Sequence, residues 1–212
     1  MTKLKTSISL VINLCVTAAA GFVIYKSAVE SGETGLGLLK LFKYFSIDAS
    51  IFALIASAVT AAFDLRILAG KSSRLPHRVE IFKYIAAVLS TLTILVAAVT
   101  LAPYRGFAAT FSGIGLLMYL LIPLGTLLSF ALFEKYSLIL FMETLIALLP
   151  VVIYVSSDLA AVAFLKMRSS FYSFDNQTQW LPNMIIILSV SFIVCLLVRL
   201  LHDTGLKKHR MR

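Results

Sequence analysis

The chain has 212 residues, of which 60% are hydrophobic and 14% charged, and its formal net charge is +9. A soluble domain of this length could not bury so much apolar surface, and such domains carry about 25% charged residues. The composition therefore excludes an ordinary soluble domain and predicts a polytopic membrane protein.

Six segments are long and apolar enough to cross a bilayer as helices, for which about 20 residues are needed. In chain order they cover residues 7–26, 43–65, 82–102, 112–133, 137–156 and 182–201. The first is longer than the apolar region of an ordinary signal peptide and lacks a suitable cleavage context, so it is interpreted as a span. The predicted fold class is all-α, with residues 1–212 forming a single domain, a six-transmembrane-helix bundle.

The basic residues predict how this bundle is oriented, because Lys and Arg are enriched in cytoplasmic loops. Thirteen of the 19 Lys and Arg residues, Lys83 among them, fall at the predicted end that holds both termini, and six fall at the other end. We therefore expect both termini in the cytoplasm, in a multi-pass protein of the cell membrane, such as a bacterial inner membrane. Contact with anionic lipids accounts for the basic charge, and no nucleic-acid-binding motif is present.

The second span begins with polar residues in the stretch KYFSIDASIF, residues 43–52. Ser46 and Ser50 lie on one helix face that continues with small residues, which favour close helix packing. Asp48 lies about 200° round the helix from Ser46, at about 100° per residue, and so faces another helix or water. Because an ionisable group inside a span is costly, Asp48 and Ser50 are candidate binding residues.

The fourth and fifth spans contribute two further candidates. Pro123 cannot donate a backbone hydrogen bond to the carbonyl of Tyr119, so a kink is predicted there. At about 1.5 Å per residue, Tyr119 lies at a depth from the outer end similar to that of Ser46 and Asp48. Glu143, the third candidate binding residue, lies about 20 Å below the outer boundary. Ser46, Asp48 and Tyr119 can therefore share a site in the outer leaflet, whereas Glu143 lies too deep to join them.

Two more carboxylates, Asp64 and Glu134, fall at the inner ends of the second and fourth spans. Each has a basic neighbour in sequence, Arg66 and Lys135. They are interpreted as interfacial ion pairs, which contribute little to stability. We expect no metal site and no cofactor.

Short motifs in the chain resemble the androgen-induced-gene family and its bacterial six-span relatives. Lys43-Tyr-Phe-Ser46 is similar to the Lys-Tyr-Leu-Thr and Tyr-Phe-Thr motifs of that family, and Tyr119-Leu-Leu-Ile-Pro123 is similar to the His-x-x-x-Pro pattern of the bacterial relatives. The eukaryotic members are intramembrane hydrolases of fatty acid esters of hydroxy fatty acids, with a threonine nucleophile and a histidine partner. The resemblance implies that Ser46 stands at the nucleophile position and Tyr119 at the histidine position.

Tyrosine at the histidine position argues against hydrolysis. A serine needs a base to become a nucleophile, and a tyrosine with its usual pKa of about 10 is a poor base near neutral pH. The preferred hypothesis is a catalytically degenerate relative, not an enzyme, that binds a lipid, an acyl chain or a membrane partner.

Two alternatives stay open. One is an active serine-dependent lipid-ester hydrolase, and the other is a small proton- or cation-coupled transporter that uses Asp48 and Glu143 as two stations. The expected partners are membrane lipids, with a second copy of the chain or another membrane protein, and not nucleic acid.

Overall fold

The computed structural model describes residues 3–32, 42, 44–134, 136–165 and 180–210. The secondary structure of these residues is helical, and η marks a π-helical turn. In chain order the elements are α1 (Lys3–Glu30), α2 (Phe45–Leu68), α3 (His77–Val96), η2 (Ala97–Leu101), α4 (Ala102–Arg105), α5 (Phe107–Thr110), α6 (Gly113–Leu116), η3 (Leu117–Leu121), α7 (Ile122–Leu128), η4 (Ser129–Phe133), α8 (Phe141–Leu165) and α9 (Trp180–Arg210).

Six helical segments of the described chain are long and apolar enough to cross a membrane, which confirms the predicted all-α, six-span class. They are Lys3–Glu30, Phe45–Leu68, His77–Arg105, Gly113–Phe133, Phe141–Ala160 and Pro182–Thr204. The third begins five residues before the predicted start at 82, because Pro76 has an extended backbone and the helix starts directly after it. Glu80 and Lys83 therefore lie inside this helix.

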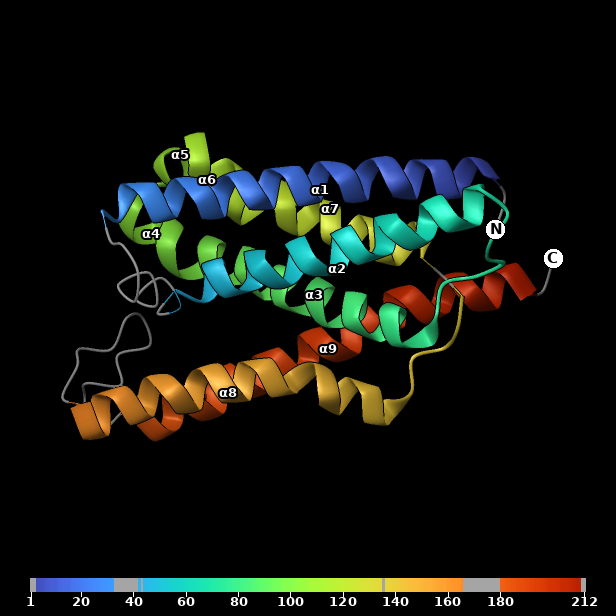
Figure 1. Ribbon diagram of the computed structural model, residues 1–212. Helices are drawn as coiled ribbons and strands as arrows, with labels where there is room; N and C mark the ends of the chain where they lie inside the picture. Colours follow the sequence, from blue (N-terminus) through green and yellow to red (C-terminus); the bar gives the residue numbers. More distant parts are fainter. Residues whose placement is uncertain (1–2, 33–41, 43, 135, 166–179, 211–212) are drawn as a thin grey trace.

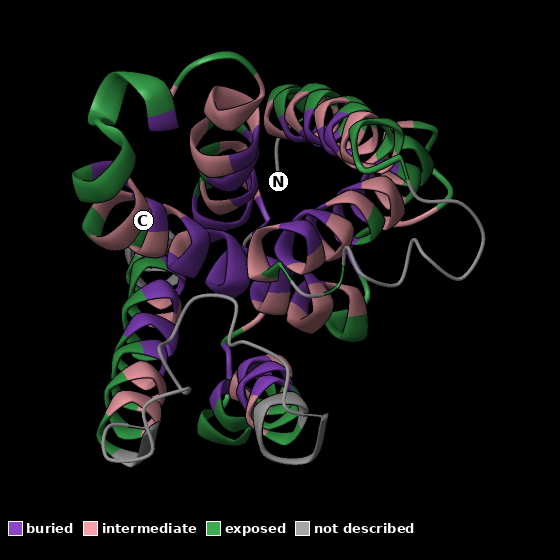
Figure 2. Cartoon of the chain, turned by 90° about the vertical axis from the view of Figure 1, so that its left-hand side faces the viewer, coloured by how far each residue is buried: buried purple, intermediate pink, exposed green. Residues whose placement is uncertain are grey.

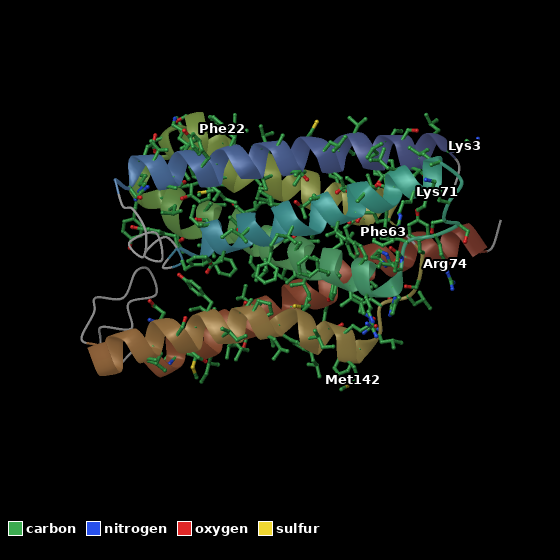
Figure 3. All side chains as sticks on the ribbon, in the orientation of Figure 1. Lys3, Phe22, Phe63, Lys71, Arg74 and Met142 are labelled. Atoms are coloured by element: carbon green, nitrogen blue, oxygen red, sulfur yellow. The ribbon has the colours of Figure 1, made fainter. Side chains whose placement is uncertain are left out.

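Both termini, the connection between α2 and α3 and the connection before α8 lie at one end of the bundle, which we call the terminal end (Figure 1). The opposite end, where α2 and α9 begin, is called the far end. Figure 3 shows Lys3, Lys71 and Arg74 together at the terminal end. This concentration of basic residues supports the terminal end as the cytoplasmic one, which stays a prediction.

Helices α1 and α2 run antiparallel and pack closely against each other (Figure 1). Seen along the bundle, buried residues line the faces where helices meet, and exposed residues lie on the outer faces (Figure 2). The buried residues of α1 recur every three or four positions, as Thr6, Ser9, Asn13, Val16, Ala20 and Val23. The three nearest the terminal end are polar and the three nearest the far end are apolar, so this interface is polar in one half only.

The fourth crossing is irregular, as predicted. The π-helical turn η3 directly precedes Pro123, and a second one, η4, ends the crossing. A π turn accommodates the hydrogen bond that proline cannot donate by widening the helix locally. After η4 the chain leaves the helix at Glu134, which places that side chain against α1 and α3.

Gly125 in α7 is the closest packing point between this crossing and α1. A Cβ added there would lie 2.7 Å from Cγ2 of Val16. We expect Gly125→Ala to lower the free energy of unfolding by about 1–3 kcal/mol, the usual cost of overpacking. Unfolding of the purified protein in mixed micelles measures this change.

Gly21 in α1 provides the matched control. A Cβ there would lie 3.5 Å from Cδ1 of Leu54, an ordinary contact. Gly21→Ala should therefore be neutral or stabilise the helix by up to about 1 kcal/mol, the difference in helix propensity. Equal losses from Gly21→Ala and Gly125→Ala would contradict close packing at Gly125.

Candidate functional site

The side chain of Lys83 is fully buried between α1, α2 and α3. Its Nζ donates hydrogen bonds to Oδ1 of Asn13 and to Oγ of Ser57, the latter over 2.7 Å. It also lies 3.9 Å from Oε1 of Glu134. We call Lys83, Asn13, Ser57, Glu134 and Asp64 the lysine cluster.

Glu134 is the carboxylate that Lys83 faces most directly. Its Oε1 accepts hydrogen bonds from Nδ2 of Asn13, over 2.8 Å, and from Oγ of Ser129. Its Oε2 is buried and has no hydrogen-bond partner among the described residues. A buried carboxylate that accepts hydrogen bonds at only one of its two oxygens is incompletely compensated for the loss of water.

Asp64 is the second carboxylate of the lysine cluster. It is 1% exposed, and the polar side chains around it are Ser9, Asn13, Lys83 and Glu134. Neither of its oxygens makes a hydrogen bond of normal geometry within the described chain. An ionised carboxylate in this position would be poorly compensated, whereas a protonated one would carry no charge.

The charges of the lysine cluster balance only if it also holds a proton. Lys83 supplies one positive charge, and Asp64 and Glu134 supply two negative charges when both are ionised. One proton shared between the two carboxylates makes the cluster neutral. Because two nearby carboxylates disfavour each other's ionisation, the arrangement can take up and release a proton.

A second buried polar group lies nearer the terminal end, where α3, α8 and α9 meet. We call it the histidine network, and its members are His77, Glu80, Ser137, Glu143, His202 and Asp203. Glu80 is its centre. The Glu80 carboxylate accepts hydrogen bonds from the backbone N–H groups of Tyr136 and Ser137, over 2.9 and 3.1 Å, and from Oγ of Ser137.

His202 is fully buried in this network and stacks on the ring of Phe130, with 4.5 Å between the centroids. Its Nε2 lies 3.2 Å from Oε1 of Glu80 and 3.2 Å from the backbone oxygen of Glu134, and its Nδ1 lies 3.2 Å from Oδ1 of Asp203. The backbone oxygen of Glu134 and the ionised carboxylates of Glu80 and Asp203 are acceptors, so a protonated His202 ring would donate from both nitrogens.

His77 is the exposed member, with 44% of its side chain accessible. Its Nε2 lies 2.6 Å from Oε1 of Glu143, and its Nδ1 lies 2.7 Å from Oγ of Ser137. Since that hydroxyl donates its only hydrogen to Glu80, it accepts one from Nδ1 of His77.

Tyr136 lies between the lysine cluster and the histidine network, outside the membrane-crossing segments. Burial, and then the negative charges of Asp64, Glu134 and Glu80, raise the pKa of Tyr136 to about 12. Its hydroxyl therefore stays neutral at physiological pH. It provides a polar but uncharged boundary between the two groups.

Of the residues predicted to share an outer site, Ser46 and Asp48 lie in the first turn of α2, which begins at the far end (Figure 1), and Tyr119 lies in η3. Ser46 is partly buried, and its backbone oxygen accepts a hydrogen bond of 2.7 Å from Oγ of Ser50. Oδ1 of Asp48 is buried without a hydrogen-bond partner, and Tyr119 packs against an apolar cluster that includes Ile47. Within the described chain, these residues make their hydrogen bonds elsewhere: the Ser46 oxygen accepts from Ser50, and the Asp48 backbone N–H donates to the oxygen of Tyr44, so no hydrogen bond joins Ser46, Asp48 and Tyr119 to one another.

Glu143 lies at the terminal end, where it binds His77. Its Oε2 also accepts a hydrogen bond of 2.7 Å from the backbone N–H of Leu140 at the start of α8. Its position thus differs from that of the far-end residues. His77 and His202 contact other members of the histidine network, and no hydrogen bond within the described chain joins either of them to Ser46.

Two interpretations of the sequence were wrong. Asp64 and Glu134 do not lie at the membrane interface, because both carboxylates are 1% exposed and both lie beside Lys83; the predicted partner Lys135 is outside the described residues. Lys83 is not a loop residue, because α3 starts at His77 and carries it into the bundle. A usable signal was present in α1, where Thr6, Ser9 and Asn13 continue the buried spacing of the apolar residues that follow.

The fold and these polar groups define the class of protein. It is an all-helical membrane protein whose six crossings enclose charged side chains at one end. The described residues contain no group of three or more His, Cys, Asp or Glu side chains arranged to hold a metal ion. No protein-family model, curated protein or solved structure matches the chain.

Proposed function

We propose that this chain is a small proton-coupled membrane transporter and that the lysine cluster is its proton-binding site. The observation that supports this function is the combination of one buried lysine with two buried carboxylates, of which Asp64 has no hydrogen-bond partner among the described residues. A site of this kind changes its charge whenever it gains or loses one proton.

A purely structural ion pair would need only one carboxylate. One lysine and one carboxylate compensate each other, and even such a pair is often no better than an apolar replacement. The second carboxylate adds a desolvation cost without adding a partner. Ionisable groups of this type inside membrane bundles mark proton or ion pathways.

Asp48 and Glu143 extend the proposed path towards the two ends. Glu143 lies in the histidine network at the terminal end, and Asp48 lies near the far end. Ser57 and Asp48 are separated by about 14 Å along α2, at 1.5 Å per residue. The buried face of α2 over this interval consists of the small residues Ala49, Ser50, Ala53 and Ala56.

Proton flux into liposomes tests this function. The reconstituted chain should acidify liposomes under an imposed pH gradient, measured with an enclosed pH-sensitive dye. Glu134→Gln and Asp64→Asn should each reduce the rate at least tenfold, because each removes one of the two carboxylates that share the proton. Glu30→Gln is the matched control, because Glu30 is exposed and, among the described residues, forms its ion pair with Lys26 over 3.4 Å.

The same assay separates the proposal from the lipid-ester alternatives. Ser46→Ala should leave the flux unchanged, because Ser46 lies at the far end and makes no contact with the lysine cluster. A flux that is equal in the Glu134→Gln, Asp64→Asn and parent proteins would overturn the proposal. A chain that conducts nothing but cleaves a lipid ester in a Ser46-dependent way would favour the hydrolase.

A further inference from the structure

We propose that the histidine network is a proton relay between the solvent at His77 and the buried His202. The inference rests on the proposed function in one respect, since it names how protons from the solvent reach His202, beside the lysine cluster. It depends on a different set of residues, and it can be measured without any transport.

The relay is a continuous chain of hydrogen bonds. His77 is 44% exposed at its start, and its Nδ1 lies 2.7 Å from Oγ of Ser137. That hydroxyl donates to Oε2 of Glu80. The other oxygen of Glu80, Oε1, lies 3.2 Å from Nε2 of His202. Two side chains, Ser137 and Glu80, thus connect an exposed imidazole to a fully buried one.

The end of the relay lies beside the lysine cluster. Nε2 of His202 is 3.2 Å from the backbone oxygen of Glu134, whose carboxylate faces Lys83. Glu80 and Lys83 are one turn apart on α3. The histidine network therefore lies between the solvent of the terminal end and the proposed proton-binding site.

An inward transfer occurs in two steps. In the first, the proton on Nδ1 of His77 moves to Oγ of Ser137 while the hydroxyl proton of Ser137 moves to Oε2 of Glu80. This step leaves a neutral His77 and a neutral Glu80. In the second, the Glu80 carboxyl group turns and gives its proton to Nε2 of a neutral His202, which restores the Glu80 carboxylate. His77 then regains a proton from water.

Charged groups on α8 and α9 orient the two histidines of the relay. Glu143 on α8 fixes Nε2 of His77, and Asp203 on α9 fixes Nδ1 of His202. Arg199 lies 3.5 Å from Oδ2 of Asp203. Each of the three carboxylates Glu80, Glu143 and Asp203 thus lies against a histidine or arginine side chain that can carry the compensating positive charge.

Ser137→Ala interrupts the relay with little change to the backbone hydrogen bonds around it. It removes the hydroxyl that joins His77 to Glu80 but keeps the backbone N–H of residue 137, which donates to Oε1 of Glu80 over 3.1 Å. The measurement uses the full chain in lipid nanodiscs with ¹⁵N-labelled histidine rings. It records how fast the ring N–H protons of His202 exchange with deuterated solvent.

We expect fast exchange in the parent protein despite complete burial of His202, and at least tenfold slower exchange in Ser137→Ala. Ser137→Thr should restore the parent rate because it returns a hydroxyl to the same position. Ser191→Ala is the matched control, a buried serine on the same helix as His202 that donates only to the backbone oxygen of Ile187. A melting temperature within about 2 °C of the parent separates the relay from a structural role.

Slow exchange in the parent protein, or equal rates in the parent and Ser137→Ala, would overturn the relay. Exchange that depends on Ser137 in a chain that carries no proton flux would leave the relay standing and reject the transport function. Proton flux that requires Glu134 but not Ser137, with equal His202 exchange rates in the parent and Ser137→Ala, would support the transport function and reject the relay.

Discussion

Lys83→Met is expected to lower the free energy of unfolding by about 3–5 kcal/mol, the usual cost of removing one partner of a buried ion pair. Methionine fills a similar volume but provides no charge for Glu134 and no donor for Asn13 or Ser57. The loss should appear as unfolding at a lower denaturant fraction in mixed micelles.

A double variant identifies the cause of that loss. In Lys83→Met with Glu134→Gln, the uncompensated carboxylate is gone, so most of the lost stability should return. Lys26→Met is the control, because Lys26 is 44% exposed and its pair with Glu30 should contribute under about 1 kcal/mol. A double variant as unstable as Lys83→Met alone would show that packing, and not charge, determines the loss.

Glu80→Ala is expected to cost a similar amount, about 3–5 kcal/mol, for a different reason. Glu80 is the fully buried acceptor that connects α3 to the segment before α8 and to α9. Its removal leaves the backbone N–H groups of Tyr136 and Ser137 without this acceptor, and His202 keeps only Asp203 and the backbone oxygen of Glu134 among its partners in the described chain. Protease accessibility of the segment 134–140 should rise together with the fall in stability.

Glu80→Gln distinguishes charge from hydrogen bonding at this junction. The amide oxygen can still accept from the backbone of Tyr136 and Ser137, but it brings no negative charge to His202. We therefore expect a loss smaller than that of Glu80→Ala. Equal effects of the two variants would mean that the ionic contact with His202 outweighs the backbone hydrogen bonds.

The six crossings could be predicted because an apolar run about 20 residues long reports directly on its lipid solvent. The kinked fourth crossing was predictable for a similarly local reason, since the effect of Pro123 is confined to the preceding turn. Both inferences need no knowledge of which helices are neighbours.

The lysine cluster could not be predicted in this way. Hydropathy does not distinguish a lysine at the membrane interface from one that is enclosed by other helices, and Lys83 lies only one residue from the predicted start of its span. Its relation to Glu134 depends on how α3 and η4 pack, which is a tertiary property. The polar residues Ser9 and Asn13 were the local hint, because they share the buried spacing of α1.

The order of Lys83's partners along the chain bears on how the protein enters the membrane during synthesis. Asn13 and Ser57 precede Lys83 in sequence, and Glu134 follows it. Because N-terminal segments emerge first from the ribosome, α1 and α2 already present an amide and a hydroxyl when the lysine arrives. These two groups, together with the carboxylate of Asp64 on α2, can hold the charged helix in the bilayer until Glu134 of the fourth crossing joins it.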